Sequence, residues 1–374
     1  MRLIQFLMPL SGMLLLSIPF AIAAQTFSSH NTRFSLETVA GGLEHPWSLA
    51  FLPDGSMLVT ERAGRLRVIK SGRLLPQAIE GLPSLAVSGQ GGLLDVVLHP
   101  EFADNKTLFL SYAHRSSQGM TTRVARGIFE GERLKDVSTI FEALPRSNTS
   151  RHFGGRMAFD ASGHLYISVG DRGEMDRAQD TRDDAGGVHR ITSNGEPAPG
   201  NPGLDDPSIN NTFFTWGNRN IQGMTLHPET GELWTHEHGP RGGDEINILS
   251  SGTNYGWPEI TYGIGYSGLP ITLHTEKEGM AQPLHYWDPS IAPSGMAFYT
   301  GSEFPQWQGS LFVGALKLRK LVRLEIENGQ VMEEEDLLTS LNERIRDVRT
   351  GPDGSLWLLT DSSKGKVYRV VPAQ

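Results

Sequence analysis

Short apolar runs alternate along this chain with turns built from glycine, proline and aspartate. Stretches with a sustained helical period are hard to find, so the pattern predicts an all-β protein. One unit recurs six times, and it consists of an apolar strand, a turn and a second apolar strand. The six copies begin at Ser48, Leu93, Gly155, Gly223, Gly295 and Asp347.

Six copies at intervals of roughly fifty to seventy residues are typical of a six-bladed β-propeller with four-stranded antiparallel blades. In the last copy, Leu356 and Leu358 face one way and Trp357 and Leu359 the other. Apolar residues on both faces are expected when each blade packs between two others. A two-layer β-sandwich is the alternative, but it explains neither the six copies nor their even distribution.

Two segments, 174–215 and 251–290, carry fewer strand signals and more glycine and proline than the rest. We expect them to be long loops on one face of the propeller, where functional residues commonly lie.

The first residues combine Arg2, an apolar run and a small-residue "AIA" stretch, which is the pattern of a secretory signal. Residues 1–24 are therefore predicted to be a signal peptide, and residues 25–374 a single propeller domain. An uncleaved membrane anchor is the alternative, because the run is nearly long enough to span a bilayer. Cleavage would yield a periplasmic or secreted protein without stable membrane association.

Charge and composition narrow the function. The formal net charge is −9, and the 33 Lys and Arg residues are spread along the chain, which argues against a nucleic-acid partner. The absence of cysteine excludes disulfides, thiolate zinc sites and a cysteine nucleophile. Any metal must be held by oxygen or imidazole ligands.

The segment "HEHGPRGGDEINIL", residues 236–249, is rich in potential metal ligands. Its two histidines allow a zinc site, although the spacing is not that of a helical HExxH motif. Its carboxylates, and the carbonyls that its glycines expose, suit a hard cation such as Ca²⁺. A polar turn without any ion is equally compatible with the segment.

Polar side chains also recur just ahead of the repeated strands, where a propeller would bring them to its central axis. Any one of them alone is most simply a solvated surface residue. Together they predict a site for a flat, polyanionic small molecule. They are Gln90, His152, Arg219, Asn220, Lys317, Arg344 and Arg346.

Seven motifs, in order, resemble those of the soluble quinoprotein sugar dehydrogenases, in particular the bacterial periplasmic aldose sugar dehydrogenase branch. They are "GQGGLLDV", "HFGGR", "EHGPRGGDEIN", "NYGWP", "SGMAFY", "LFVGALK" and "RIRDVRTGPDG". The resemblance extends from Leu43 to Val370. It implies a six-bladed propeller that binds pyrroloquinoline quinone (PQQ) and Ca²⁺.

The resemblance also implies roles for individual residues. His152 would be the general base that takes the proton of the anomeric hydroxyl while the C1 hydride passes to the quinone. Asp171 would orient His152, and Arg219 would stabilise negative charge on the quinone oxygen. The cofactor-contacting positions would be Gln90, Arg219, Asn220, Tyr266, Ala315, Lys317, Arg344 and Arg346. The carbonyls of Gly239 and Pro240 would hold a catalytic Ca²⁺. Glu245 and the carbonyl of Tyr255 would hold a second, structural Ca²⁺.

The predicted activity is thus PQQ-dependent oxidation of an aldose, of the glucose or sorbosone type, to a lactone. Because no haem-attachment motif is present, the electrons would leave to an external acceptor. Two alternatives remain open at this point: a calcium-dependent propeller lactonase or hydrolase, and a propeller that only binds carbohydrate.

Overall fold

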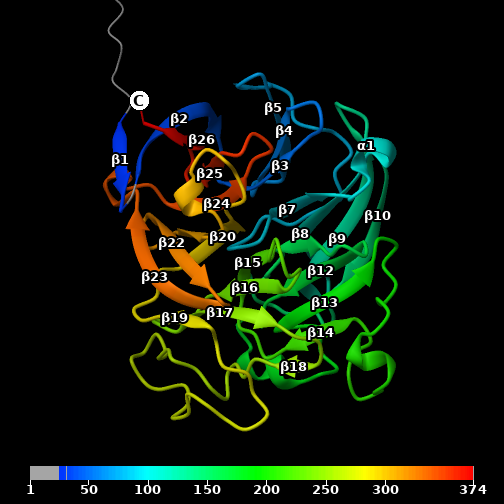
Figure 1. Ribbon diagram of the computed structural model, residues 1–374. Coiled ribbons are helices and arrows are strands. Elements are labelled where there is room, and N and C mark those ends of the chain that lie inside the picture. Colours follow the sequence, from blue (N-terminus) through cyan, green and yellow to red (C-terminus); the bar gives the residue numbers. More distant parts are fainter. Residues whose placement is uncertain (1–24, 31, 374) are drawn as a thin grey trace, which may run out of the picture.

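The computed structural model describes residues 25–30 and 32–373, so the predicted signal peptide lies outside the described residues. Within this part of the chain, six sheets are arranged in a ring (Figure 1). No helix in it is long and apolar enough to cross a membrane.

The sheets form six blades, numbered here along the chain. Blade 1 contains β3 (Pro46–Phe51), β4 (Met57–Glu61), β5 (Arg65–Lys70) and β6 (Arg73–Leu74). Blade 2 contains β7 (Leu93–Leu98), β8 (Thr107–Ser116), β9 (Gly119–Phe129) and β10 (Leu134–Glu142). Blade 3 contains β11 (Met157–Phe159), β12 (His164–Val169), β13 (Gly187–Thr192), β14 (Phe213–Trp216) and β18 (Thr253–Asn254).

The second half of the chain continues the same order. Blade 4 contains β15 (Ile221–Leu226), β16 (Leu233–Glu237), β17 (Asp244–Leu249) and β19 (His285–Trp287). Blade 5 contains β20 (Pro293–Phe298), β21 (Leu311–Ala315), β22 (Lys320–Glu327) and β23 (Gln330–Leu337). Blade 6 contains β24 (Ile345–Thr350), β25 (Leu356–Thr360), β26 (Gly365–Pro372), β2 (Thr32–Leu43) and β1 (Thr26–Ser29). The helical elements are α1 (Phe102–Asn105) and the 3₁₀ turns η1 (Met175–Gln179), η2 (Pro202–Leu204), η3 (Pro305–Trp307) and η4 (Thr339–Leu341).

The predicted six-bladed propeller is confirmed. Each repeated hairpin forms the first two strands of one blade, and the innermost strands β3, β7, β11, β15, β20 and β24 contact one another in succession around the ring. Every blade has four antiparallel strands, and two blades gain a fifth: β1 on blade 6, and β18, which runs parallel to β14, on blade 3.

The ring is closed by the two ends of the described chain. Strand β2 pairs antiparallel with β26, from Phe34 opposite Pro372 to Leu43 opposite Gly365. The hairpin pattern alone did not predict this closure, because it joins strands from opposite ends of the sequence.

The hydrophobic core is divided among the contacts between blades. Each pair of neighbouring blades shares one cluster of buried side chains, and six clusters complete the circuit. Leu356 and Leu358 of β25 join the cluster with blade 5, whereas Leu359 and Trp357 join the cluster with blade 1. The predicted two-faced burial of this strand is therefore confirmed.

One prediction was partly wrong. Segment 174–215 contains β13 and β14, the third and fourth strands of blade 3, and is not only a loop. Strand β13 has the sequence "GVHRIT", in which His189 and Arg190 interrupt the apolar pattern. His189 is fully buried and hydrogen-bonds to the Asp184 carbonyl and to Thr212, so tertiary partners permit a polar residue in a strand. Segment 251–290 is mostly irregular, as expected, with short β18 and β19 at its two ends.

Candidate active site

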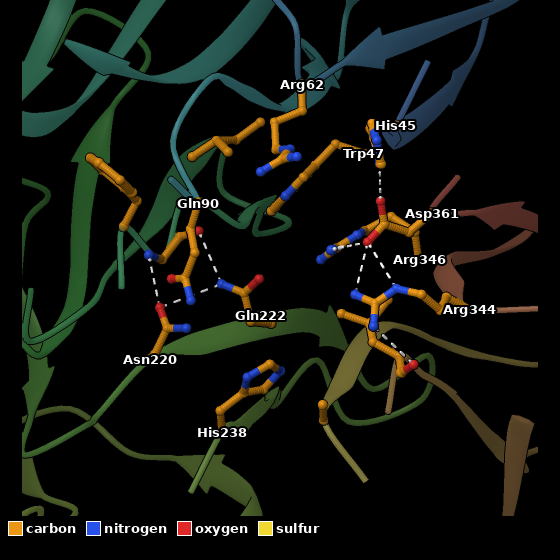
Figure 2. Close-up of a pocket in the computed structure, with 15 residues that line it drawn as sticks. His45, Trp47, Arg62, Gln90, Asn220, Gln222, His238, Arg344, Arg346 and Asp361 are labelled. Carbon is orange, nitrogen blue, oxygen red and sulfur yellow. Dashed lines mark hydrogen bonds and ion pairs between the residues drawn. The ribbon is translucent and has the colours of Figure 1, made fainter. Parts of the chain in front are cut away.

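A cavity of about 500 Å³ lies at the centre of the ring. Every blade contributes to its wall at a residue that lies just before, or at the start of, the innermost strand. These residues are His45, Gln90, Gly154, Asn220, Ala292 and Arg344. The structure thus brings Gln90, Asn220, Arg344 and Arg346 together, as the spacing of the repeats led us to expect (Figure 2).

The cavity has more positive than negative charge in its wall. Arg344 and Arg346 each donate to Asp361 Oδ2 at 3.0 Å, and His45 contacts the other oxygen at 2.8 Å (Figure 2). Arg62 also lines the cavity, and its guanidinium donates to the Gly89 carbonyl at 2.6 Å. The cavity wall therefore contains three arginines and a single aspartate, which bonds to two of them, and this excess of positive charge suits an anionic ligand.

A network of charged residues lies along the axis and borders this cavity. Arg156 Nη1 is 3.0 Å from Asp347 Oδ1 and 3.5 Å from Asp95 Oδ1, and Arg349 bonds to the same two aspartates. The Arg156 guanidinium lies 4.2 Å from the ring centroid of Trp47, which lines the cavity. Two arginines meet two aspartates here, so this network is neutral without a ligand.

His152 is held in a defined orientation by Asp171. Its Nδ1 lies 2.6 Å from Asp171 Oδ1, and the Trp257 indole donates to Asp171 Oδ2 at 2.9 Å. The carboxylate also accepts from the Gly173 backbone at 2.6 Å. Because a carboxylate accepts hydrogen bonds, Nδ1 carries the proton and Nε2 is left with its lone pair.

The electrostatics keep this pair in the state that a general base needs. Burial lowers the pKa of His152, and nearby Arg219 lowers it further, whereas Asp171 partly opposes them. Burial alone would raise the pKa of Asp171, but the hydrogen bonds from His152 and Gly173 bring it below its ordinary value. Near neutral pH the imidazole is therefore neutral and the carboxylate charged.

The backbone around His152 is shaped for this position. His152 itself adopts a left-handed conformation with φ of 51°, and its N–H donates to the Gln90 side chain at 2.7 Å. Gly154 is also left-handed, and its N–H donates to Asn220 Oδ1 at 3.1 Å. A side chain at Gly154 would meet the Ser168 carbonyl at 2.6 Å, so this turn requires glycine.

His152 and Asp171 line a second cavity of about 490 Å³, together with Arg219, Pro240 and Tyr266. Tyr266 is 71% exposed, and Leu269, which is also exposed, lines the same cavity. Arg219 donates to the carbonyls of His238 and Gly239 at 2.9 and 3.2 Å, and its guanidinium lies 5.4 Å from the Trp257 ring. The base thus opens toward a partly apolar hollow beside the central cavity.

A small third cavity, about 10 Å³, is lined by two carboxylates, Glu237 and Glu245, and by Tyr255 and Gly239. Glu237 and Glu245 are directly opposite each other on β16 and β17. Burial raises the pKa of Glu237 to about 7, and burial with repulsion from Glu237 raises that of Glu245 well above its ordinary value. Two facing carboxylates of this kind fit a hard cation that would neutralise them.

This cation site would need backbone oxygens as well. Among the described residues, no three histidine or acidic side chains come together as metal ligands. His236 is fully buried in β16, whereas His238 lines the central cavity and contacts the Pro293 carbonyl at 2.5 Å. Carbonyl ligands, as expected from the glycines of this segment, would complete the coordination.

Two of the expected cofactor-contacting residues lie differently from the rest. Ala315 is fully buried at the end of β21, and Lys317 is exposed. Neither lines the central cavity or the second cavity, whereas Arg219 and Tyr266 line the second one and Leu316 lines the central one. Conversely, four residues that line the central cavity were not among the predicted site residues: His45, Trp47, Arg62 and Gln222. Glu237 was predicted only as one of the carboxylates of residues 236–249. His45 could have been found, because it precedes the first hairpin as Gln90 precedes the second.

Comparisons with known proteins agree with this architecture. Residues 43–369 match the family model described as Glucose / Sorbosone dehydrogenase. The chain is similar to the aldose sugar dehydrogenase YliI of Escherichia coli (strain K12), with 43% identity over 344 residues, covering 90% of this chain and 93% of that protein. It is also similar to quinoprotein glucose dehydrogenase B of Acinetobacter calcoaceticus, with 25% identity, covering 91% of this chain and 88% of that protein.

Solved structures show the same likeness. The apo-form crystal structure of the soluble aldose sugar dehydrogenase from Escherichia coli matches with a TM-score of 0.88 and 43% identity, covering 91% of this chain and all of that one. The PQQ-bound aldose sugar dehydrogenase from Streptomyces coelicolor matches with a TM-score of 0.74 and 28% identity, covering 90% of this chain and 98% of that one.

Proposed function

Because the chain belongs to the glucose/sorbosone dehydrogenase family, we propose that it oxidises aldose sugars at the anomeric carbon to lactones. The proposal includes PQQ as the hydride acceptor, Ca²⁺ as a second cofactor and an external acceptor for the electrons. The observation that carries it is the oriented His152–Asp171 pair beside a cavity with excess positive charge.

His152 acts as the general base. With the Nδ1 proton held by Asp171, Nε2 accepts the proton of the anomeric hydroxyl of a sugar in the second cavity. Asp171 stabilises the imidazolium that results, and the Trp257 indole keeps the carboxylate in place. When PQQ is bound, it supplies the electrophilic quinone that accepts the hydride from C1.

The remaining site residues hold and orient the cofactors. Arg344 and Arg346 supply positive charge for the carboxylates of PQQ, and Gln90 and Asn220 supply amides in the same wall. The family resemblance also assigns cofactor contacts to Arg219, Tyr266, Ala315 and Lys317. The carbonyls of Gly239 and Pro240 supply oxygen ligands for the catalytic Ca²⁺. Glu245 and the Tyr255 carbonyl supply those for a second, structural Ca²⁺, to which Glu237 adds a carboxylate.

The sequence pattern supports the location. Residues 1–24 act as a signal peptide, residues 25–374 form a single domain, and the protein works in the periplasm or outside the cell. This location would give it both Ca²⁺ and access to an acceptor that is not part of its own chain.

The test is sugar-dependent dye reduction by purified apoprotein with PQQ, Ca²⁺ and a panel of aldoses, for the natural chain and two variants. His152→Ala should lower kcat by roughly 10²–10⁴-fold and retain cofactor uptake. His164→Ala is the matched control, because His164 also pairs with an aspartate, Asp160 at 3.2 Å, but lines neither active-site cavity.

The outcomes separate this activity from the two alternatives. Turnover that requires both cofactors and is lost only in His152→Ala supports the dehydrogenase. Absence of PQQ uptake rules it out: lactone hydrolysis with Ca²⁺ alone would then indicate a hydrolase, and sugar binding without any turnover a carbohydrate-binding propeller.

A further inference from the structure

A further cavity of about 450 Å³, distinct from the three described above, lies beside the central cavity and shares Arg344 and Asp361 with it. Its wall contains four cationic side chains, Arg319, Arg344, Lys364 and Lys366, and two acidic ones, Glu343 and Asp361. We propose that this hollow, the Arg319–Lys364 surface, docks an acidic one-electron redox protein that takes the electrons from the reduced enzyme. This rests on the proposed function, because it concerns the second half of that reaction.

The charges of this surface are available to a partner. Both acidic residues are already engaged, Glu343 by Lys366 at 2.7 Å and Asp361 by Arg344 and Arg346. Among the described residues, neither Arg319 nor Lys364 forms an ion pair; Arg319 donates only to the amide oxygen of Asn342 at 3.0 Å. Both side chains belong to exposed residues.

The sign of this surface is opposite to that of the whole molecule. The chain carries a formal net charge of −9, so an acidic protein would be repelled by the molecule as a whole and attracted to this surface. Such a contrast orients an encounter and raises its rate more than its affinity. Leu318, next to Arg319 in the chain and 44% exposed, adds an apolar side chain near this surface, and transient redox encounters need only a small interface.

The position separates the acceptor from the sugar. His152 faces the hollow that contains Tyr266, whereas the Arg319–Lys364 surface meets the central cavity at Arg344 and Asp361. In Figure 2 these two residues lie across the cavity from Gln90 and Asn220, the two side chains that fix the turn at His152. A docked partner would therefore leave the sugar side open.

The electron balance requires two encounters. Oxidation of one aldose to its lactone releases two electrons and two protons. A one-electron acceptor protein in its oxidised form takes one electron in each of two successive encounters, and the protons leave to solvent. The surface itself only binds and orients the acceptor.

The test compares the double variant Arg319→Glu/Lys364→Glu with the control Lys70→Glu/Arg73→Glu. The control reverses two exposed neighbouring cations on blade 1, so the change in net charge is the same. The direct probe is a fluorescent hexaglutamate peptide titrated into apoprotein at low ionic strength. We expect the test variant to bind it roughly tenfold more weakly than the natural chain, and the control to bind it within about twofold.

The second readout is the reoxidation half of the reaction in reconstituted enzyme. With ferricyanide, an anionic one-electron acceptor, kcat/KM should fall roughly tenfold in the test variant, and added salt should reduce the difference. With phenazine methosulfate, a cationic acceptor, the kcat/KM of the test variant should not fall, and its KM for the sugar should be unchanged. If the double glutamate variant does not fold, Arg319→Gln/Lys364→Gln should show the same directions with smaller effects.

Two results would overturn the proposal. Equal peptide binding by natural and test chains would exclude an acidic partner at this surface. If the test variant loses turnover with ferricyanide but the natural chain does not bind the peptide, the surface is a site for small anions and not for a docking protein. The proposed function fails differently, through absence of sugar oxidation with both acceptors, and the peptide titration remains informative in that case.

Discussion

Two regions on the propeller axis each contain a largely buried arginine, and the pKa values of the two arginines, Arg349 and Arg346, are shifted in opposite directions. In the axial network, Arg349 contacts Asp95 and Asp347, and although burial lowers the pKa of Arg349, these aspartates raise it above its ordinary value. In the central cavity, burial lowers the pKa of Arg346, and Arg344 and Arg156 lower it further against the single Asp361. The charges of the first region therefore balance one another, whereas the second region has positive charge left for a ligand.

The largest expected effect comes from breaking the complete network. Arg156→Met leaves Asp95 and Asp347 with one arginine instead of two, and we expect a loss of about 3–5 kcal/mol in the free energy of unfolding. Denaturant unfolding of apoprotein measures it. Arg344→Met in the cavity is the comparison from the second region, and it should change stability by less than about 1 kcal/mol, because the Arg344 side chain is 41% exposed. Equal losses in the two variants would mean that the two regions do not differ.

The next largest expected effect is on stability with and without Ca²⁺, and it concerns the facing carboxylates Glu237 and Glu245. If this pair binds Ca²⁺, the ion at a hundredfold excess over its Kd should stabilise the fold by about 2.7 kcal/mol. Glu237→Gln should raise the stability measured in chelator, because it removes the repulsion, and should reduce the gain that Ca²⁺ brings. Thermal unfolding with and without Ca²⁺ measures both. A full gain in Glu237→Gln would place the ion elsewhere.

A smaller effect is expected on cofactor binding. Arg346→Gln removes one of the cations that share Asp361, and it should weaken PQQ uptake by about 1.5 kcal/mol or more, roughly tenfold in Kd. Absorbance titration of apoprotein measures this Kd. Arg349→Gln, in the neutral network, should lower stability and leave the Kd of the folded fraction nearly unchanged. The reverse pattern would contradict the assignment of the two regions.

The smallest effect is a shift in pH dependence. The base must be neutral, and the pKa of His152 lies below its ordinary value of 6.5, so kcat should fall only below that pH. Asp171 raises the pKa of His152, so Asp171→Asn should move the acid limb of the profile to still lower pH while lowering its plateau. Profiles of kcat between about pH 5 and 8 show this. A limb that moves to higher pH would mean that His152 is not the group that titrates.

The sequence predicted most of the fold because the relevant signals are local. Each hairpin repeats an apolar pattern on both strand faces, and that pattern can only be buried between two neighbouring sheets. The position of Gln90 or Asn220 just ahead of an innermost strand was readable for the same reason. Strand β13 was missed because His189 and Arg190 interrupt its apolar pattern, although the fold buries His189 with hydrogen bonds to the Asp184 carbonyl and to Thr212.

The sequence alone thus predicted the six blades and the all-β architecture. It also predicted four of the polar residues that line the central cavity, namely Gln90, Asn220, Arg344 and Arg346. Only the tertiary structure decided which charges are neutralised. Asp347 meets Arg156 across 191 positions, and Trp257 reaches Asp171 across 86. Such pairs depend on how the ring closes, through β2 and β26, and not on any local pattern. The physical reason is that burial and Coulomb interactions act through space, so neighbours in the fold decide the state of an ionisable group.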